Sequence, residues 1–456
     1  MIIALSNRKE SKLIKKIVCV GAGSSSIIAA LHLLDEGFKG ELTLVGKPFG
    51  PAYETLAPYH ILNVTAGNMS ALVKDPLHFY HFASLLLDRP DLEKTAFVPR
   101  KVFRDYLQNL LDTLKNHGVK HQKDEAIAIL AVNKGYTVYL KDGTTCDADC
   151  VILAIGNFPS FPLPGSEHLT ANQYVDIPWD KNITTDLDPK ARILFVGTGL
   201  TMVDGLATLN YHRHQGQVIA LSRRGLLPLV RTMADPLPLS YDQLPHHSTR
   251  QLMRFLRNKA KEVWHNGEPW DRVIDGVRPF LQTLWQALPD IEKKRFLRHA
   301  CVYWDIHRHR IPQESDEILQ SFLRTKQLHV MAARLLRVQP KGQAVEVTFK
   351  RRGQNSTENM MVDRVVNCTG PVVDYTKVKS LLVQRLFAEG LARPHPLRLG
   401  FDATVDGKLI DKDGNIQDRL ITLGSPLKGV LWESIAIPEI REEARKLAKM
   451  LIENRK

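Results

Sequence analysis

Two glycine-rich segments are the residues whose types and spacing could bind a phosphate-bearing cofactor. The first is Gly21-Ala22-Gly23-Ser24-Ser25-Ser26, and the second is Gly197-Thr198-Gly199-Leu200-Thr201-Met202. In a GxGxxG turn the first glycine permits a tight bend, and the second lets the backbone approach a pyrophosphate. The helix that follows offers free N–H groups and a positive dipole end to the phosphates. The pattern therefore predicts a dinucleotide site at each segment, formed by Gly21, Gly23, Ser24, Ser25 and Ser26 in the first and by Gly197, Gly199, Leu200 and Thr201 in the second.

Both segments depart from the usual fingerprint. Ser26 stands at the third glycine position, where it is still small enough to keep helix and strand close, but Met202 at the equivalent place is larger. An acidic residue that binds the ribose normally ends the strand after the first turn, and here Val45 is followed by Gly46 and Lys47. The ribose must then be held in another way, and the alternative interpretation is a purely structural glycine turn.

Arg223 and Arg224 follow the strand after the second turn, where an acid would favour NADH. Arginine at this place suits a 2′-phosphate through charge-assisted and stacking contacts, which favours NADP over NAD without excluding NAD. The alternative is that both arginines lie on a solvated face. Two nucleotide sites in one chain are most simply explained by FAD at one and NAD(P)H at the other, with hydride passing from nicotinamide to flavin.

Buried strands and amphipathic helices must position these turns. Residues 17–20 form a short apolar run, typical of a parallel strand that is buried on both faces. Apolar residues then recur at helical spacing until Gly37, and residues 42–45 form a second apolar run. Residues 191–224 repeat the same strand–turn–helix–strand order. The predicted fold class is α/β, with two Rossmann-like dinucleotide-binding domains.

The predicted domain plan places one nucleotide domain inside the other. The FAD-binding domain is discontinuous, with residues 1–160 as its first part and residues 365–456 as its second part. Residues 161–364 form the NAD(P)H-binding domain. Amphipathic helical segments make a helical insertion within it at about 233–312. A terminal helix is expected over residues 438–454, and an Asp-Gly turn predicts a hairpin at 409–416.

Composition and charge exclude several other classes of protein. The chain has 456 residues, of which 44% are hydrophobic and 24% charged, so it is neither disordered nor a small disulfide scaffold. Its net charge of +13 permits anionic partners without choosing among them, and no nucleic-acid recognition motif accompanies it. No transmembrane segment or signal peptide is expected, so the predicted location is cytoplasmic. None of the five cysteines forms a CxxC pair, which argues against disulfide reductase chemistry.

Further segments resemble a known family over nearly the whole chain. The chain is similar to the flavoproteins with two dinucleotide-binding domains, and more closely to a bacterial FAD/NAD(P)-binding branch related to NADPH-dependent flavin monooxygenases. The segments that carry the resemblance are GPAYETLAPYHILNVTAGNMSALVKDPLHF, FVPRKVFRDYL, VGTGLTMVDG, LSRRGLLP, YWDIHRHRIP and LGSPLKGVLWESIAIPEIREEA.

The resemblance implies further cofactor-binding residues in the first domain. Asn63, Met69 and Ser70 would lie near the flavin ring, and Arg100 would contact FAD.

It also implies roles for residues near the domain crossings and the last helix. Gly156 matches the glycine at which the chain crosses between domains, although Ile155 replaces the usual threonine, and Thr369-Gly370 keeps that pattern better. Gly424 and the stretch at Trp432 would bring the last helix toward the flavin.

The cluster His307-Arg308-His309-Arg310 allows two interpretations. No further ligands complete a metal set, so no metal is expected. The basic residues could face the phosphates of NADPH or an anionic substrate, or they could form a structural cluster. An anionic small molecule therefore remains one possibility for the substrate.

The function predicted from these features is an FAD-dependent, NAD(P)H-using oxidoreductase of monooxygenase-like type. Hydride would pass from NADPH to flavin and then to oxygen and a small substrate that the sequence does not identify. No residue stands out as a catalytic base. The alternative is a non-enzymatic flavin-binding redox sensor or scaffold whose basic helical insertion binds a partner.

Overall fold

The first glycine turn lies between a buried strand and a helix. In the computed structural model, which describes residues 13–177, 179 and 183–453, β1 (Lys16–Gly23) leads into α1 (Ser24–Asp35) and then β2 (Glu41–Phe49). Strand β1 is parallel to β2, and its residues Ile17 to Val20 are buried. The strand–turn–helix–strand order predicted from the apolar runs is confirmed.

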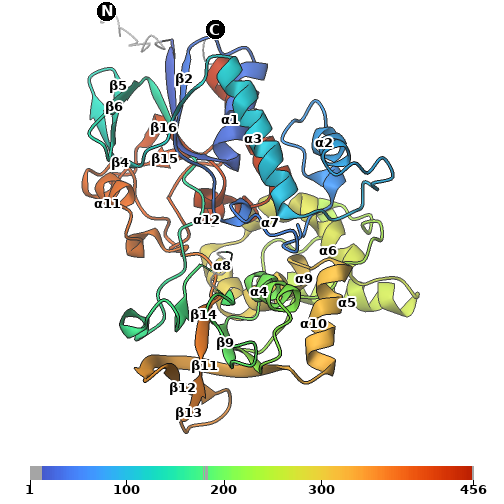
Figure 1. Cartoon of the computed structure of the whole chain (residues 1–456). Helices are drawn as coiled ribbons and strands as arrows, with labels where there is room; N and C mark the ends of the chain where they lie inside the picture. The colour runs from blue at the N-terminus through green and yellow to red at the C-terminus, as the bar shows by residue number, and fades with distance from the viewer. Residues whose placement is uncertain (1–12, 178, 180–182, 454–456) are drawn as a thin grey trace, which may run out of the picture.

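Six strands form the first sheet over the described residues, in the order β15-β16-β7-β1-β2-β3. The remaining strands of this sheet are β3 (Lys120–Gln122), β7 (Cys150–Leu153), β15 (Lys408–Ile410) and β16 (Ile416–Thr422). All neighbouring pairs are parallel except β15 with β16, which form the predicted hairpin. Strands from both ends of the chain therefore share one sheet (Figure 1).

Different layers cover the two faces of this sheet. Ile17 and Cys19 pack with α1, α3 (Arg100–Asn116) and α13 (Ile437–Glu453) in one core. The alternate residues Val18 and Val20 face a second core on the other side, as the strand period of two requires. That core is covered by α11 (Leu381–Ala388) and by an antiparallel sheet of β4 (Ala126–Val132), β5 (Gly135–Leu140) and β6 (Thr145–Ala148).

The second glycine turn belongs to a second sheet. Over the described residues this sheet has seven strands, in the order β13-β12-β11-β10-β9-β14-β8. Its strands are β8 (Tyr174–Val175), β9 (Ile193–Val196), β10 (Val218–Ser222), β11 (Leu328–Lys341), β12 (Ala344–Arg351), β13 (Glu358–Val362) and β14 (Arg364–Asn367). Helices α4 (Leu200–Tyr211) and α10 (Gln313–Arg324) pack together on it. The predicted α/β fold with two Rossmann-like sheets is confirmed, whereas the exact domain borders stay a prediction.

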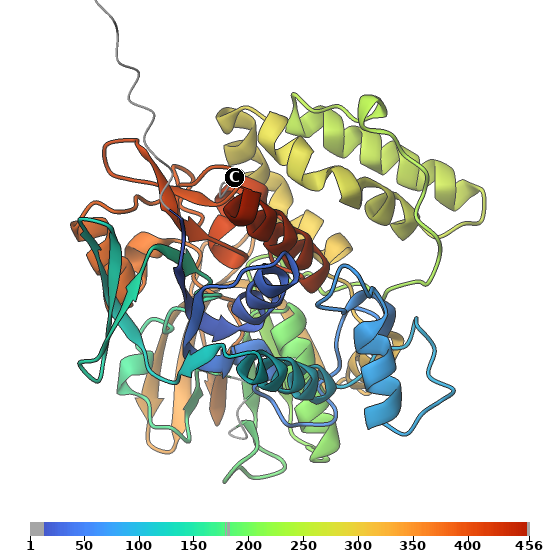
Figure 2. The ribbon, with the colours of Figure 1, turned by 90° about the horizontal axis from the view of Figure 1, so that it is seen from above.

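The helices between β10 and α10 form a separate group. They are α5 (Thr249–His265), α6 (Asp271–Val277), α7 (Leu281–Ala287), α8 (Asp290–Arg295), a π-helical turn (Phe296–Ala300) and α9 (Cys301–Arg308). Seen from above, this group lies to one side of the sheets and next to α13 (Figure 2). Two further helices lie between strands or helices of the parts that flank this group, α2 (His78–Leu86) in residues 1–160 and α12 (Lys428–Leu431) in residues 365–456.

Short 3₁₀ turns complete the described elements. They are Pro51–Tyr53, Ala66–Asn68, Ser166–His168, Tyr241–Gln243, Arg278–Phe280, Tyr375–Lys377 and Ser425–Leu427. Among the described residues, no helix is long and apolar enough to span a lipid bilayer. All five cysteines are free thiols.

Candidate functional site

The first glycine turn can be built only with glycine at its first position. Gly21 has a φ of 105°, and a Cβ placed there would lie 2.2 Å from the carbonyl oxygen of Ala154 at the end of β7. Gly23 is the N-cap of α1, with no side-chain cap and no acidic residue in the first turn. The first N–H groups of the helix therefore have no side-chain acceptor, which is the arrangement that binds a pyrophosphate.

The second glycine turn repeats this construction. Gly197 has a φ of 117°, and a Cβ there would lie 2.1 Å from the carbonyl oxygen of Cys368, just beyond β14. Gly199 is the N-cap of α4, again without a side-chain cap or an acid in the first turn. A Cβ on Gly199 would meet no described atom within 4 Å, so space beside this glycine is open. Both turns fit a dinucleotide phosphate.

The buried Ser26 hydroxyl adds to this fit at the first turn. Its Oγ is fully enclosed and has no hydrogen-bond partner within the part of the chain that the structure describes. Buried polar groups normally have partners, so an unpaired hydroxyl at this place indicates room for one more polar contact.

Strand β2 extends past the position after the first turn where the sequence lacks the usual acidic residue. Strand β2 does not end at Val45 but continues through Gly46 and pairs Pro48 and Phe49 with Ala22 and Gly23. Gly46 has a φ of 130°. The backbone of β2 thus runs alongside the glycine turn where the carboxylate would otherwise stand.

A histidine on the neighbouring strand also contacts this region. The ring Nε2 of His121 on β3 lies 2.9 Å from the carbonyl oxygen of Gly46. Partial burial lowers the pKa of His121, so the neutral ring is favoured near neutral pH. No sequence motif indicated His121.

The two arginines after β10 differ in their surroundings. Arg224 Nη1 donates to the hydroxyl of Tyr303 at 2.9 Å, and its guanidinium lies 4.9 Å from the centre of that ring. Arg223 is exposed, and no acidic side chain of the described residues lies within ion-pair distance of it. Arg223 is therefore the better placed of the two to meet a phosphate.

Gly424 is brought directly against the first turn. It has a φ of 77°, and a Cβ there would lie 2.9 Å from Ser25 Oγ. The buried Ser434 hydroxyl lies 2.9 Å from the Gly424 carbonyl oxygen and 2.6 Å from Glu443 Oε2. Gln282 Nε2 donates to the other oxygen of Glu443 at 3.2 Å. The last helix thus holds the Gly424 loop on the turn.

The hydrogens of this contact favour a protonated carboxyl. The Ser434 hydroxyl has one hydrogen but faces two oxygen acceptors, the Gly424 carbonyl and Glu443. Both contacts are satisfied when Glu443 carries a proton and donates it to Ser434 Oγ. Burial raises the pKa of Glu443 to about 7, against the opposing effect of the Ser434 hydrogen bond. No sequence motif indicated Glu443.

The loops that follow β7 and β14 lie side by side. Phe158 and Val372 form an isolated antiparallel bridge, with the Val372 N–H donating to the Phe158 carbonyl at 3.2 Å. Gly156 stands at the start of the first loop, and its carbonyl accepts a hydrogen bond of 3.2 Å from the Tyr375 hydroxyl. Thr369 and Gly370 begin the second loop. The predicted residues at the two crossings are therefore neighbours in space.

A cavity opens where these loops meet the Gly424 segment. It has an empty volume of about 550 Å³, counting the space at its open mouth. We call it the strand-end cavity, and its lining residues are Asn157, Pro371, Val372, Val373, Tyr375, Gly400, Ser425, Lys428 and Ile435. Three of these residues directly follow predicted ones, namely Gly156, Gly370 and Gly424. Lys428 is the one charged residue of this lining, and no sequence motif indicated it.

Other predicted residues make contacts within the protein. Met69 is buried in the core of the first part, and the Ser70 hydroxyl donates to the Asp75 carbonyl at 2.6 Å. Asn63 is only partly buried. Their proximity to a flavin ring stays a prediction.

Arg100 joins the two parts of the molecule. Its guanidinium pairs with Asp204 of α4 at 2.9 Å, and both side chains are nearly buried. The indole of Trp179 donates to the same carboxylate at 2.8 Å. The side chain thus has a structural partner, and a contact with FAD stays a prediction.

Trp432 faces the helical group between β10 and α10. Its ring stacks on Trp285, with the centroids 4.7 Å apart, and it packs edge-on against Phe296. The residue has a φ of 55°, which is strained for a bulky side chain. A contact of Trp432 with FAD stays a prediction as well.

The basic cluster near the end of α9 is paired with acids. Arg310 is fully buried and bonds to Asp271 and Asp275 of α6. Arg308 pairs with Glu433 at 3.2 Å, again among buried side chains. These arginines support the structural interpretation of the cluster. In the described part of the chain, no three metal-binding side chains gather at one place.

Comparisons with known proteins agree with this geometry. A sequence profile for a family described as FAD-NAD(P)-binding matches residues 18–158, which include the first turn. None of the curated proteins compared with the chain matches it.

Solved structures share the fold over nearly the whole chain. The ornithine N-hydroxylase from Kutzneria sp. 744 aligns with a TM-score of 0.68 and 15% identity, covering 98% of this chain and 100% of its own. The ornithine hydroxylase from Pseudomonas aeruginosa gives 0.67 and 16%, covering 97% and 100%. The L-lysine 6-monooxygenase from Pseudomonas syringae gives 0.64 and 14%, covering 97% and 100%. At such identities the likeness establishes the fold.

Proposed function

We propose that the protein is an FAD-dependent, NAD(P)H-using oxidoreductase of the monooxygenase-like type. The observation that carries the proposal is the repeated construction of the two turns. In each, a first glycine closes against a neighbouring strand end, and a helix begins with uncapped N–H groups. The shared fold with N-hydroxylating enzymes supports it, because one such structure is described with reduced FAD, NADP+ and L-ornithine.

The first turn would hold FAD and the second NADPH. Gly21, Gly23 and the N–H groups of α1 would meet the FAD pyrophosphate, while the Gly424 loop closes on the same turn. Gly199 and the N-terminus of α4 would meet the NADPH pyrophosphate, with Arg223 toward the 2′-phosphate. When bound, the two cofactors supply hydride transfer and the reaction with oxygen.

The strand-end cavity is the proposed place of reaction. Its wall includes Pro371, Val372 and Ile435, which would limit the access of water, and its polar groups include Lys428 and Asn157. Tyr375 is held by its hydrogen bond to Gly156, and burial raises its pKa, so it stays a neutral phenol. These groups would orient a small-molecule substrate.

Reduction of the flavin is the direct test. The purified protein should be yellow, and anaerobic NADPH should bleach the flavin absorbance near about 450 nm faster than NADH does. A colourless protein that cannot be loaded with FAD would overturn the proposal. A yellow protein that neither nucleotide bleaches would instead favour a non-enzymatic flavin-binding sensor or scaffold.

A further inference from the structure

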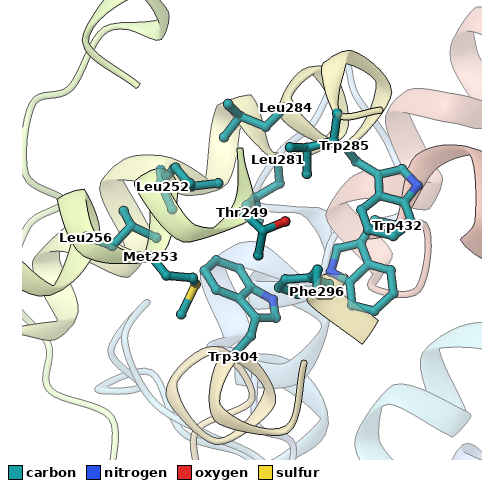
Figure 3. A pocket seen from close by; sticks show the side chains of 12 residues that line it. Thr249, Leu252, Met253, Leu256, Leu281, Leu284, Trp285, Phe296, Trp304 and Trp432 are labelled. Atoms are coloured by element: carbon teal, nitrogen blue, oxygen red, sulfur yellow. The ribbon is translucent and has the colours of Figure 1, made fainter. Parts of the chain in front are cut away.

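A second cavity lies between the helical group and the segment that carries Trp432. It has an empty volume of about 480 Å³, counting the space at its open mouth. Figure 3 shows Leu252, Met253 and Leu256 on one side and the stacked rings of Trp285 and Trp432 on the other. We call it the indole cavity, and its lining residues are Thr249, Leu252, Met253, Leu256, Val277, Leu281, Leu284, Trp285, Leu288, Phe296, Trp304 and Trp432.

The lining offers mainly carbon and ring surfaces, and within the described residues the Trp432 indole N–H is its one polar side-chain group without a hydrogen-bond partner. The Trp285 indole N–H donates to the Gly429 carbonyl at 2.7 Å. The Trp304 N–H donates to Glu433 at 3.2 Å. The hydroxyl of Thr249, the one non-aromatic polar side chain in the lining, donates to a backbone carbonyl at 2.9 Å. No lining residue is charged.

The two cavities share a wall. Lys428 lines the strand-end cavity, and its ammonium lies 5.1 Å from the centre of the Trp432 ring, which lines the indole cavity. Trp432 has a positive φ of 55°, and its ring stacks on Trp285. Strained residues of this kind occur where a site needs a side chain in one particular place.

We propose that the indole cavity binds an apolar, aromatic molecule, on the other side of the wall that Lys428 and Trp432 form with the strand-end cavity. A flat ring can stack on or meet the edges of Trp285, Trp304 and Phe296. The ammonium of a free diamino acid such as ornithine would lose its hydration there without gaining an acceptor, and the carboxylate would meet only the Trp432 indole N–H. The ligand class of the indole cavity therefore differs from ornithine and lysine, for which enzymes with the same fold are named.

Indole is a suitable probe, because it is flat, apolar and soluble. Isothermal titration of the FAD-loaded protein, without NADPH, should give saturable binding of indole at one site and none of L-ornithine. Met253→Trp fills part of the cavity with a larger side chain and should weaken indole binding roughly tenfold or more. Met233→Trp is the matched control, because Met233 is 51% exposed and lies outside the lining. It should bind indole within about twofold of the unsubstituted chain.

The outcomes separate this inference from the proposed function. Indole binding that Met253→Trp removes supports the cavity, whether or not NADPH bleaches the flavin. A protein that bleaches with NADPH but binds no indole, or binds it equally well in both variants, overturns the inference alone. A dimer that Met253→Trp dissociates, without indole binding, would show a second copy over the cavity and would also overturn it. If Met253→Trp does not fold, as judged by thermal melting, Leu252→Phe takes its place.

Discussion

At the scale of single residues, the two glycines of the second turn are needed for different reasons. Gly197 is required by the protein itself, because a side chain would collide with the Cys368 carbonyl at a φ of 117°. Gly199 has an ordinary negative φ of −88°, and a Cβ there would enter open space. Packing within the protein therefore does not require glycine at position 199. A glycine there leaves space for a ligand that approaches the N-terminus of α4.

Alanine at these two glycines should therefore act differently. Gly199→Ala is expected to keep the unfolding midpoint and to raise the KM for NADPH roughly tenfold or more, because a methyl group would obstruct the pyrophosphate. Gly197→Ala is expected to lower the free energy of unfolding by at least about 2 kcal/mol, through strain and collision. Urea unfolding and steady-state kinetics measure both effects. An unchanged KM in Gly199→Ala would contradict NADPH binding at this turn.

Glu443 gives the protein a pH dependence with a defined sign. Its pKa in the folded chain is raised to about 7 by burial, from an ordinary value of 4.5. The folded state therefore holds a proton that the unfolded state releases, and this contribution to stability is present below pH 4.5 and lost as pH rises through about 7. Since the side chain is partly exposed, we expect this contribution to the free energy of unfolding to fall by about 2 kcal/mol across that pH range.

Replacing Glu443 by glutamine should remove this dependence. The amide of Glu443→Gln can donate to Ser434 Oγ as the protonated acid does, so the Gly424 contact is kept at every pH. As pH rises from about 5 to about 8, the free energy of unfolding of the variant should rise by about 2 kcal/mol relative to that of the unsubstituted chain. Urea unfolding measures this difference. Glu442→Gln controls for the loss of one charge on the same helix. If the difference in free energy of unfolding between Glu443→Gln and the unsubstituted chain does not vary with pH, Glu443 stays ionised in the folded protein.

At the scale of elements, most helices and strands of both turns could be predicted, because their signals are local. Apolar runs, glycines and helical spacing lie within twenty residues of each other in residues 13–50 and 191–224. The contacts that complete the site are distant in sequence. Gly424 meets Ser25, and Arg310 meets Asp271 on another helix, 39 positions away. A single chain carries no pattern that specifies such pairs, which follow only from how the elements pack.

The extension of β2 was unpredictable for a similar reason. The sequence shows a glycine where an acid is usual, but the pairing of Phe49 with Gly23 depends on the bend at Gly46 and on the neighbouring strand. The basic cluster was ambiguous because its acidic partners lie on α6 and beside α13. Local chemistry could be predicted from the residue types, whereas the partner of each residue could not.

The contact between α3 and α4 should contribute measurably to stability. Asp204→Asn leaves the nearly buried guanidinium of Arg100 without a counter-charge, which typically costs about 3 to 5 kcal/mol. Asp91→Asn is the matched control, because Asp91 pairs with Arg89 on an exposed surface, where solvent screens the attraction and the pair contributes little to stability. Urea unfolding of the two variants measures the difference. If both substitutions lower the free energy of unfolding equally, the buried pair does not stabilise the contact between α3 and α4.

At the scale of the whole molecule, α4 is where the two sheet-bearing parts meet. Besides Arg100 and Asp204, the ring of His60 lies 3.0 Å from Thr208 Oγ1 and 2.7 Å from Thr55 Oγ1. Burial lowers the pKa of His60, so the ring is neutral in this contact. The helix that would bind the NADPH pyrophosphate is therefore bonded directly to the part that would bind FAD.

This coupling predicts one cooperative unfolding transition. NADP+, proposed to bind only the second turn, should raise the melting temperature of the whole protein, with about 2.7 kcal/mol of stabilisation at a hundredfold excess over its Kd. In Asp204→Asn, calorimetry should resolve two transitions, of which NADP+ shifts only one. Two transitions in the unsubstituted protein would show that the parts unfold independently.

The bridge between Phe158 and Val372 has a consequence for how such a gene could arise. The segments that follow β7 and β14 meet at this bridge, so the whole stretch between them could enter or leave an ancestral coding sequence through one recombination event. The strands of the first sheet would stay paired, because an exchange in a surface loop leaves the hydrogen bonds between them intact. The second turn lies inside this stretch with its own strand, helix and closing carbonyl, so such an exchange would carry a whole nucleotide turn.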